Sequence, residues 1–270
     1  MNGFLSLFSI PLLAAIMAFI HPHSHPEGPV DNDAFGQGEF LKYRIHYGLI
    51  TAGFGELYVS DTLFDIRDKS CMHLVAKGYT NGSFDLFYKL RDQYESYMDT
   101  ETLLAQRFNR SIQEGKYESY TETHFDHSQQ KATYIARDKQ ETTYDVPPGI
   151  QDVISAFYFA RATYNPKDMV PGDLISLRNF LDRKTFNLWA RLEAREVIKV
   201  GKHKYQALRF DLLIEEAGLI TDGSKIKFWI SDDQNRIPLR IQSDLAIGNL
   251  KADLIEWKNL KHRFAAQFPH

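Results

Sequence analysis

The sequence predicts a mainly β fold, a large curved antiparallel sheet that forms a half-barrel or a barrel, with one inserted α-helix. Three observations predict it. From Glu39 onward, apolar and polar residues alternate with a period of two in one segment after another. Short turns rich in Gly, Asp and Asn join these segments, as in antiparallel hairpins. A sheet of about a dozen strands cannot stay flat and open, because strand twist makes it curl or split.

The first series of predicted strands ends at Pro147-Pro148-Gly149. Gly53 and Gly55 within it suit a bulge or a sharp bend in a curved sheet. Two hairpins close the series, one turning at Glu114-Gly115 and one at Asp138-Lys139. The predicted strands lie in EFLKYRIHY, GLITAGFGELYVS, CMHLVAKGY, the latter half of NGSFDLFYKLRDQYESYMD, LLAQRFNRSIQEG, KYESYTETHFDH, KATYIARD and QETTYDVP.

The segment IQDVISAFYFARATY breaks the alternation and predicts the helix. Val153, Ile154, Phe157 and Tyr158 lie on one face at helical spacing. We expect this helix to act as a lid over the hollow of the sheet. The strands that follow are predicted in DLISLRNFLD, KTFNLWARLEAREVIKV, KYQALRFDLLIEE, SKIKFWISD, RIPLRIQSDL and GNLKADLIEWK.

The composition argues against several classes of function. The 270 residues are 43% hydrophobic with a net charge of -3, and the positive residues are dispersed, so no nucleic-acid partner is expected. The lone Cys71 excludes an internal disulfide framework. No G-x-S-x-G, H-E-x-x-H or Walker motif occurs. The sequence therefore predicts a non-enzymatic protein without a cofactor.

The N-terminus predicts export. Residues 3–20 carry no charged side chain and lead directly into a polar stretch, as a signal peptide does. The alternative is a retained anchor in the inner membrane, although the run is short for a span. We therefore expect a periplasmic or otherwise exported protein with a signal peptide at 1–20, a flexible linker at 21–38 and a single β-rich domain at 39–270. Membrane association would then occur only through an uncleaved N-terminal segment.

Four stretches of the chain resemble a bacterial envelope family, the domain of unknown function 3108. They are GEFLKYRIHYGLITAG, YKLRDQYESYMDTETLLAQRFNRSIQEGKY, QDVISAFYFAR and FWISDDQNRIPLRI, and the resemblance runs from about Gly38 to the C-terminus. The architecture is more distantly similar to the lipoprotein-carrier and lipoprotein-sorting proteins. That resemblance implies a half-barrel with a helical lid that shields acyl chains.

Eight residues form the candidate ligand site. Arg107, Arg110 and Arg161 lie in aromatic or apolar stretches, where a guanidinium can hold a phosphate or carboxylate headgroup. The same arginines can instead form structural salt bridges, for example with Glu95, Asp99 or Asp152. The aromatic members, which either line the hollow or fill it, are Tyr43, Tyr47, Phe157, Tyr158 and Trp229.

Metal sites are not expected. His21, His23 and His25 lie in a polar terminal stretch, and His124 with Asp126 lacks a third converging ligand. The favoured hypothesis is an envelope protein that binds an apolar or amphipathic ligand, such as a lipid, in its curved sheet. The alternative is an interaction protein with a filled core that binds an envelope protein or a glycan. A hydrolase assembled from distant strands is the third hypothesis, and convergence of His46, His124 or Asp126 with another ligand would support it.

Overall fold

The computed structural model describes residues 28–216, 219–221, 225–246 and 248–269. The predicted signal peptide and residues 21–27 of the predicted linker lie outside the described residues. Within them, no helix is long and apolar enough to cross a membrane.

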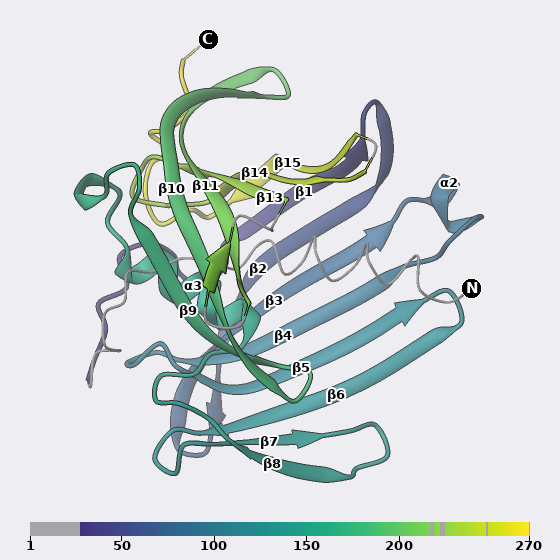
Figure 1. Cartoon of the computed structure of the whole chain (residues 1–270), viewed down its shortest axis with the longest axis vertical. Coiled ribbons are helices and arrows are strands. Elements are labelled where there is room, and N and C mark those ends of the chain that lie inside the picture. Colours follow the sequence, from purple (N-terminus) through teal and green to yellow (C-terminus); the bar gives the residue numbers. More distant parts are fainter. Residues whose placement is uncertain (1–27, 217–218, 222–224, 247, 270) are drawn as a thin grey trace.

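One antiparallel sheet contains all the strands of the described chain (Figure 1). Their order is β8-β7-β6-β5-β4-β3-β2-β1-β15-β14-β13-β11-β10-β9, with β12 paired to β11. Because β8 and β9 end this path, the sheet is a half-barrel that hydrogen bonds do not close. The mainly β prediction with an inserted helix is confirmed. The elements are β1 (Phe40–Tyr47), β2 (Ile50–Ile66), β3 (Lys69–Thr80), α2 (Gly82–Asp85), β4 (Arg91–Asp99), β5 (Ala105–Glu114), β6 (Tyr117–Asp126), β7 (Lys131–Ile135), β8 (Glu141–Asp145), α3 (Val153–Thr163), η1 (Pro166–Asp168), β9 (Leu174–Leu181), β10 (Lys184–Val200), β11 (His203–Glu216), β12 (Leu219–Thr221), β13 (Ile226–Ser231), β14 (Pro238–Asp244) and β15 (Asn249–Lys258).

A bulge near Gly53 bends the sheet as the glycines predict. The β1–β2 register shifts between Ile45 and His46, which pair with Gly53 and Thr51, so Ala52 is the extra residue. A Cβ atom at Gly53 would lie 2.2 Å from the carbonyl oxygen of Tyr79. No other residue tolerates so close a backbone approach.

Side chains bridge the two ends of the strand path. The ring of Phe180 on β9 lies 6.3 Å from that of Phe125 on β6 and 5.5 Å from that of Tyr144 on β8. The guanidinium of Arg183, in the β9–β10 turn, lies 5.7 Å from the ring centre of Tyr134 on β7. Contacts of this kind hold a barrel shape where no strand ladder does.

The structure differs from the sequence prediction in three places. The segment before β4 contains a short helix, α2, capped by the Asn81 side chain. The short strand β12 was not predicted. The predicted linker also extends too far, because Ala34 and Phe35 are buried in the core. The packed domain therefore begins before Glu39.

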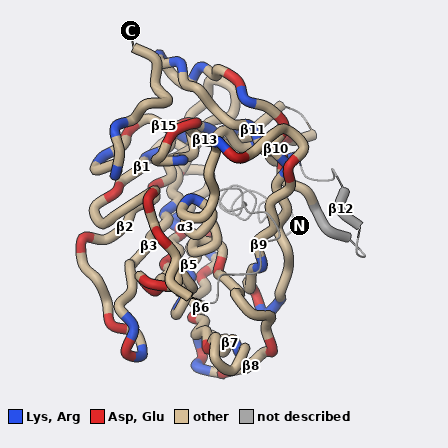
Figure 2. Tube along the Cα trace, turned by 90° about the vertical axis from the view of Figure 1, so that its left-hand side faces the viewer, with Lys and Arg blue, Asp and Glu red and all other residues tan. Residues whose placement is uncertain are grey.

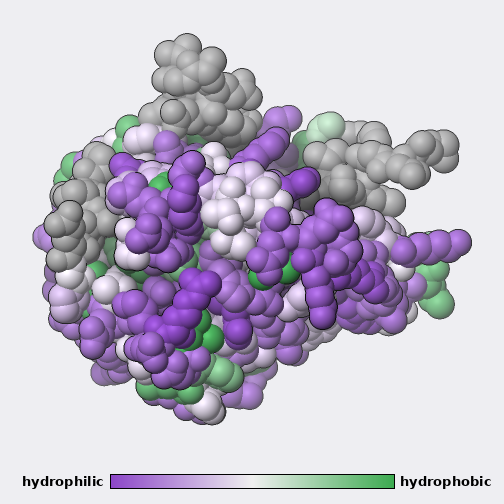
Figure 3. Space-filling view, turned by 90° about the horizontal axis from the view of Figure 1, so that it is seen from below, coloured by the Kyte–Doolittle hydropathy of each residue, from purple (hydrophilic) through white to green (hydrophobic). Residues whose placement is uncertain are grey.

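Charges of both signs are interspersed over the described residues. Lysines and arginines lie among acidic residues along the chain trace (Figure 2). The face seen from below is mainly hydrophilic, with hydrophobic residues scattered over it (Figure 3). Both views agree with the dispersed charge read from the sequence.

Candidate functional site

Helix α3 lies on the concave side of the half-barrel, where it packs against β3, β4 and β9 (Figure 1). Asp152 caps it by accepting hydrogen bonds from the backbone N–H groups of Ile154 and Ser155 at 2.7 and 2.9 Å. Ser96 on β4 donates to the other Asp152 oxygen at 2.6 Å. Burial raises the pKa of Asp152 to about 6, and these donors oppose the rise.

Every α3 residue from Val153 to Arg161 is buried. Phe157, Tyr158 and Phe159 are consecutive, yet all three are at most 3% exposed. A helix buried on every face is part of the core, so α3 does not have the half-exposed surface that a movable lid presents.

The helix is shorter than the sheet that surrounds it. Its 11 residues span about 16 Å. The ten residues of β5 span about 33 Å. Part of the concave face therefore extends beyond the helix, toward the end of the sheet that carries the β1–β2 turn, α2 and the β5–β6 turn. We call this end the far end.

Among the partly exposed apolar side chains that pack against the core cluster, we call five the apolar strip. They are Ile45, Phe186, Leu188, Ile226 and Leu245. Their strands, β1, β10, β13 and the end of β14, belong to one continuous half of the sheet. Leu188 pairs with the buried Leu177, so both face the same side of the sheet as the core.

Small residues continue this face on the neighbouring strands. Gly55 on β2 pairs with Tyr43 on β1 and with Gly78 on β3. Gly78 in turn pairs with Asp92 on β4. Because Gly55 and Gly78 are adjacent, this part of the concave face has no side chains. The concave face thus combines partly exposed apolar residues on one side with bare backbone on the other.

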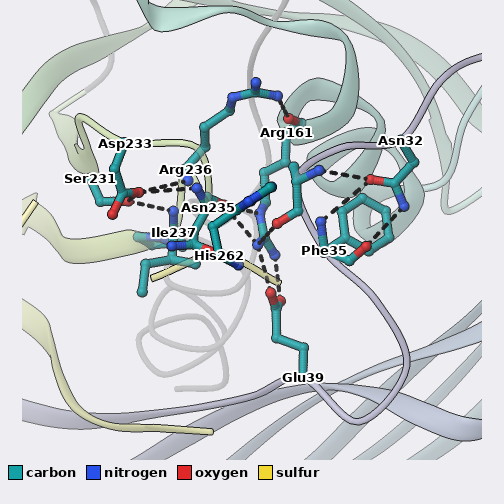
Figure 4. Close-up of polar contacts among 12 residues, drawn as sticks. Asn32, Phe35, Glu39, Arg161, Ser231, Asp233, Asn235, Arg236, Ile237 and His262 are labelled. Atoms are coloured by element: carbon teal, nitrogen blue, oxygen red, sulfur yellow. Dashed lines mark hydrogen bonds and ion pairs between the residues drawn. The ribbon is translucent and has the colours of Figure 1, made fainter. Parts of the chain in front are cut away.

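Arg161 is the centre of a buried polar network that joins four distant segments (Figure 4). Its guanidinium donates to both carboxylate oxygens of Glu39, at 2.6 and 2.8 Å. It also donates to the backbone oxygens of Asn235, at 2.8 Å, and of Ala34. Burial alone would lower the pKa of Arg161, but the Glu39 carboxylate outweighs it and leaves the pKa raised.

The turn between β13 and β14 completes this network. Asp233 accepts hydrogen bonds from Ser231 and from the backbone N–H groups of Asn235 and Ala265. Arg236 donates to the backbone oxygens of Arg161 and Ala162 at the end of α3. The network thus ties the N-terminal segment, α3, this turn and the C-terminal segment together.

The other two candidate arginines lie on opposite faces of β5. Arg110 pairs with Tyr94 of the core and forms an ion pair with Asp182 in the β9–β10 turn. Among the residues that the structure describes, its buried Nε has no hydrogen-bond partner. Arg107 faces the outside, where its guanidinium lies 3.9 Å from the centre of the Tyr97 ring. Of the three arginines, Arg110 therefore combines a concave-side position with an unused donor.

The candidate aromatic residues do not form one site. Tyr43 is buried and donates a hydrogen bond to Pro238 O at 3.0 Å. Burial raises its pKa well above the ordinary value, and the nearby Arg161 guanidinium opposes the rise. Trp229 follows the core residue Phe228 on β13, so it faces outward, where it donates to Glu196 at 2.6 Å. Tyr47 is 39% exposed at the end of β1.

The histidines have ordinary structural partners. His46 contacts Asp253, which also accepts two hydrogen bonds from Arg240. His124 contacts Glu122 and Arg67. Among the described residues, no three His, Cys, Asp or Glu side chains are grouped closely enough to hold a metal ion.

Sequence reasoning missed Asp92, an acidic group on the concave side of β4. It is 4% exposed and accepts a hydrogen bond from the backbone N–H of Gln113 at 3.2 Å. Burial, together with the nearby Glu114 carboxylate, raises the pKa of Asp92 to about 7. Alternation predicts the side on which Asp92 lies, but Glu114 approaches it from another strand.

We expect Asp92→Asn to change the pH dependence of stability. Between the ordinary Asp pKa and pH 7 the folded protein binds a proton that the unfolded chain releases, so stability falls as the pH rises through this window. In urea unfolding, the stability of the variant relative to the native protein should rise from pH 5 to pH 8, and the variant should be the more stable of the two at pH 8.

Asp253→Asn is the matched control with the opposite sign. Burial opposes ionisation of Asp253, but Arg240 and His46 outweigh it and lower the pKa. This variant should lose stability at both pH values. If Asp92→Asn also lost stability at pH 8, the raised pKa would be contradicted.

A separate cavity of about 550 Å³ lies over β3–β6. Tyr79 and Lys77 alternate with core-facing residues on β3, so the cavity is on the outer face, opposite α3. Its lining is mixed, with aromatic, amide, hydroxyl and charged groups. The lining residues are Lys77, Gly78, Tyr79, Arg91, Asp92, Gln93, Ser111, Ile112, Gln113, Glu118, Ser119, Tyr120 and Arg137.

Three solved structures match this chain, and the first of them is similar in fold. A beta-barrel-like protein of the domain of unknown function DUF1849 from Brucella abortus has a TM-score of 0.53 at 9% identity, over 84% of this chain and 98% of that one. A protein from Bacteroides fragilis, described as exported and with a YmcC-like fold, has a TM-score of 0.37 at 11% identity, over 85% and 100%. A protein from Parabacteroides distasonis, described as a lipoprotein, has a TM-score of 0.32 at 9% identity, over 85% and 99%.

The remaining comparisons concern sequence. The search of curated proteins found no match. The family model "Protein of unknown function (DUF3108)" matches residues 42–255, which include every strand from β2 to β14 and helix α3. The chain therefore belongs to the DUF3108 family of proteins of unknown function.

Proposed function

We propose that this chain is an exported, non-enzymatic envelope protein that holds an apolar or amphipathic ligand, such as a lipid, against the concave face of its sheet. The observation that carries the proposal is the apolar strip, which continues the core beyond α3 but stays partly exposed. Each ligand methylene buried there contributes about 0.8 kcal/mol, so an acyl chain can bind without covalent chemistry. The uncharged run at residues 3–20 supports export.

The concave face also offers a polar contact for a headgroup. Arg110 faces this side, and among the described residues its Nε has no hydrogen-bond partner. A phosphate or carboxylate would supply the missing acceptor beside the ion pair that Arg110 already makes with Asp182. Arg161 is unsuited to this role, because Glu39 and two backbone oxygens already occupy its donors.

Native mass spectrometry of the purified protein tests the proposal. We expect lipid-sized mass increments on the native protein and their loss in Leu188→Glu, which places a charge in the apolar strip. Val197→Glu is the control, because Val197 lies on the same strand but is 52% exposed. An unliganded native protein, or equal lipid retention in both variants, would contradict the proposal.

The outer cavity favours a second candidate function, the binding of a glycan. Tyrosine rings with amide and hydroxyl groups, as at Tyr79, Tyr120, Gln93, Gln113 and Ser111, suit a polyhydroxylated ligand, which needs stacking surfaces and many hydrogen bonds. The same spectra separate the two candidates. A saccharide-sized increment that survives Leu188→Glu but is lost in Tyr120→Ala would favour the glycan.

A further inference from the structure

Two turns at the far end of the sheet carry fully exposed apolar side chains. Leu49 and Ile50, in the β1–β2 turn, are 102% and 60% exposed, and Leu86 and Phe87, which follow α2, are 85% and 87% exposed. Such side chains cost free energy in water and gain none from folding. Four of them on two turns form an exposed apolar set that a partner surface can cover.

These turns lie side by side. Asn81 donates from its backbone to Ala52 O at 3.1 Å and from its side chain to Thr51 O at 2.7 Å. The β5–β6 turn joins them, because Gly115 N–H donates to Lys89 O at 2.8 Å. Figure 1 shows the β1–β2 turn and α2 at the same end of the sheet, away from α3. We call Leu49, Ile50, Leu86 and Phe87 the apolar rim.

Local bonds hold the rim in this outward position. The Asn81 side chain accepts a hydrogen bond from Phe84 N–H at 2.9 Å, which caps α2. Asp85 accepts hydrogen bonds from Arg91 and from Thr80. The backbone around Leu86 and Phe87 is thus fixed by polar contacts, and their exposure is a property of the fold.

The charges around the rim complement an anionic surface. Each nearby acid has a partner: Asp85 pairs with Arg91, Glu114 accepts a hydrogen bond from Tyr88, and Glu118 pairs with Arg137. Lys89 and Lys116 are exposed and make no ion pair among the described residues. Two further tyrosines, Tyr47 and Tyr117, are 39% and 58% exposed at the same end.

We propose that the apolar rim docks the protein on an anionic lipid surface. Segments that enter the membrane interface typically carry aliphatic and aromatic side chains flanked by lysine and tyrosine, as the apolar rim does. The inference deepens the proposed function and rests on it, because docking at the far end turns the uncovered concave face toward a source of lipid.

Vesicle binding tests the proposal. The probe is vesicles of phosphatidylethanolamine and phosphatidylglycerol, and binding is measured by co-sedimentation. The variant Leu49→Ser/Ile50→Ser/Leu86→Ser/Phe87→Ser should partition about tenfold or more weakly than the native chain. Val170→Ser is the matched control, because Val170 is 62% exposed but lies between η1 and β9. All variants share residues 1–38, so the uncharged N-terminal run contributes equally to each.

A local probe reports the contact even where the N-terminal run dominates sedimentation. Tryptophan fluorescence of Phe87→Trp should be quenched by brominated lipid beyond the native protein, whereas that of Val170→Trp should not. Equal quenching in the two variants, or equal sedimentation of the four-site variant and the native chain, would overturn the docking proposal.

A third measurement separates docking from ligand binding. The probe is diheptanoyl phosphatidylglycerol below its micelle concentration, which presents a lipid without a surface. The four-site rim variant should bind this monomer as the native chain does, and Leu188→Glu should bind vesicles but not the monomer. Vesicle binding without any monomer binding would overturn the proposed function and leave docking standing. Monomer binding without vesicle binding would overturn the docking proposal and leave the proposed function standing.

Discussion

Replacing Glu39 by Gln is expected to lower the free energy of unfolding by about 3–5 kcal/mol, because it leaves the buried Arg161 guanidinium without its counter-charge. Both side chains are at most 2% exposed, and two hydrogen bonds join them. The partners are 122 residues apart in the sequence, so the pair joins the start of β1 to α3. Urea unfolding at pH 7 measures the change.

Glu118→Gln is the control for this prediction. Glu118 lies 3.6 Å from Arg137, and the two side chains are 55% and 66% exposed. Water and salt screen such a pair, so its loss should cost less than about 1 kcal/mol. If Glu39→Gln lowered the free energy of unfolding no more than the control does, the stabilising role of the buried Glu39–Arg161 ion pair would be contradicted.

Phe157→Ala should lower the free energy of unfolding by about 3–5 kcal/mol, because the truncated side chain leaves a cavity between α3 and the surrounding sheet. Phe157 is 1% exposed, and its ring lies 5.2 Å from that of Tyr158. If α3 were a movable lid, the same truncation would hardly change stability. Urea unfolding therefore distinguishes a core helix from a lid.

Tyr158→Phe is the contrasting variant. Tyr158 is 0% exposed, and its hydroxyl has no hydrogen-bond partner in the described part of the chain. Removing an unsatisfied buried hydroxyl relieves a desolvation cost, so stability should stay within about 1 kcal/mol of the native protein or rise. A loss as large as that of Phe157→Ala would contradict the packing described for α3.

Local pattern predicted the strands and the core helix well. Alternation identified β1 as half-buried, the glycines at 53 and 55 marked the bend, and the spacing from Val153 to Tyr158 located α3. Each of these features depends on residues that are close together in the sequence, so a short stretch of sequence is enough to predict it.

What escaped prediction depends on contacts between distant segments. Nothing around Arg161 indicates that Glu39 is its partner, and nothing around Arg110 indicates Asp182. Phe35 is one aromatic residue in a stretch rich in Pro, Gly and Asp, so its burial could not be read locally. The exposure of Leu86 and Phe87 arises in the same way, because apolar residues near a strand are ordinarily expected to be buried.

The candidate ligand site likewise combines residues that local sequence indicates with residues that only the strand order brings together. The sequence favoured arginines and aromatic residues, and the structure places Tyr43, Phe157, Tyr158 and Arg161 together in the core. The residues that stay partly exposed on the concave face are mostly aliphatic, and each is unremarkable in its own strand. Only the strand order brings them together.

A crystal structure of the protein with a phospholipid brominated on its acyl chain tests the central claim most directly. The account predicts anomalous bromine density on the concave face beyond α3, between Leu188 on β10 and Gly55 on β2. Density confined to the outer cavity over β3–β6, or side chains that fill the concave face with no lipid bound, would contradict it.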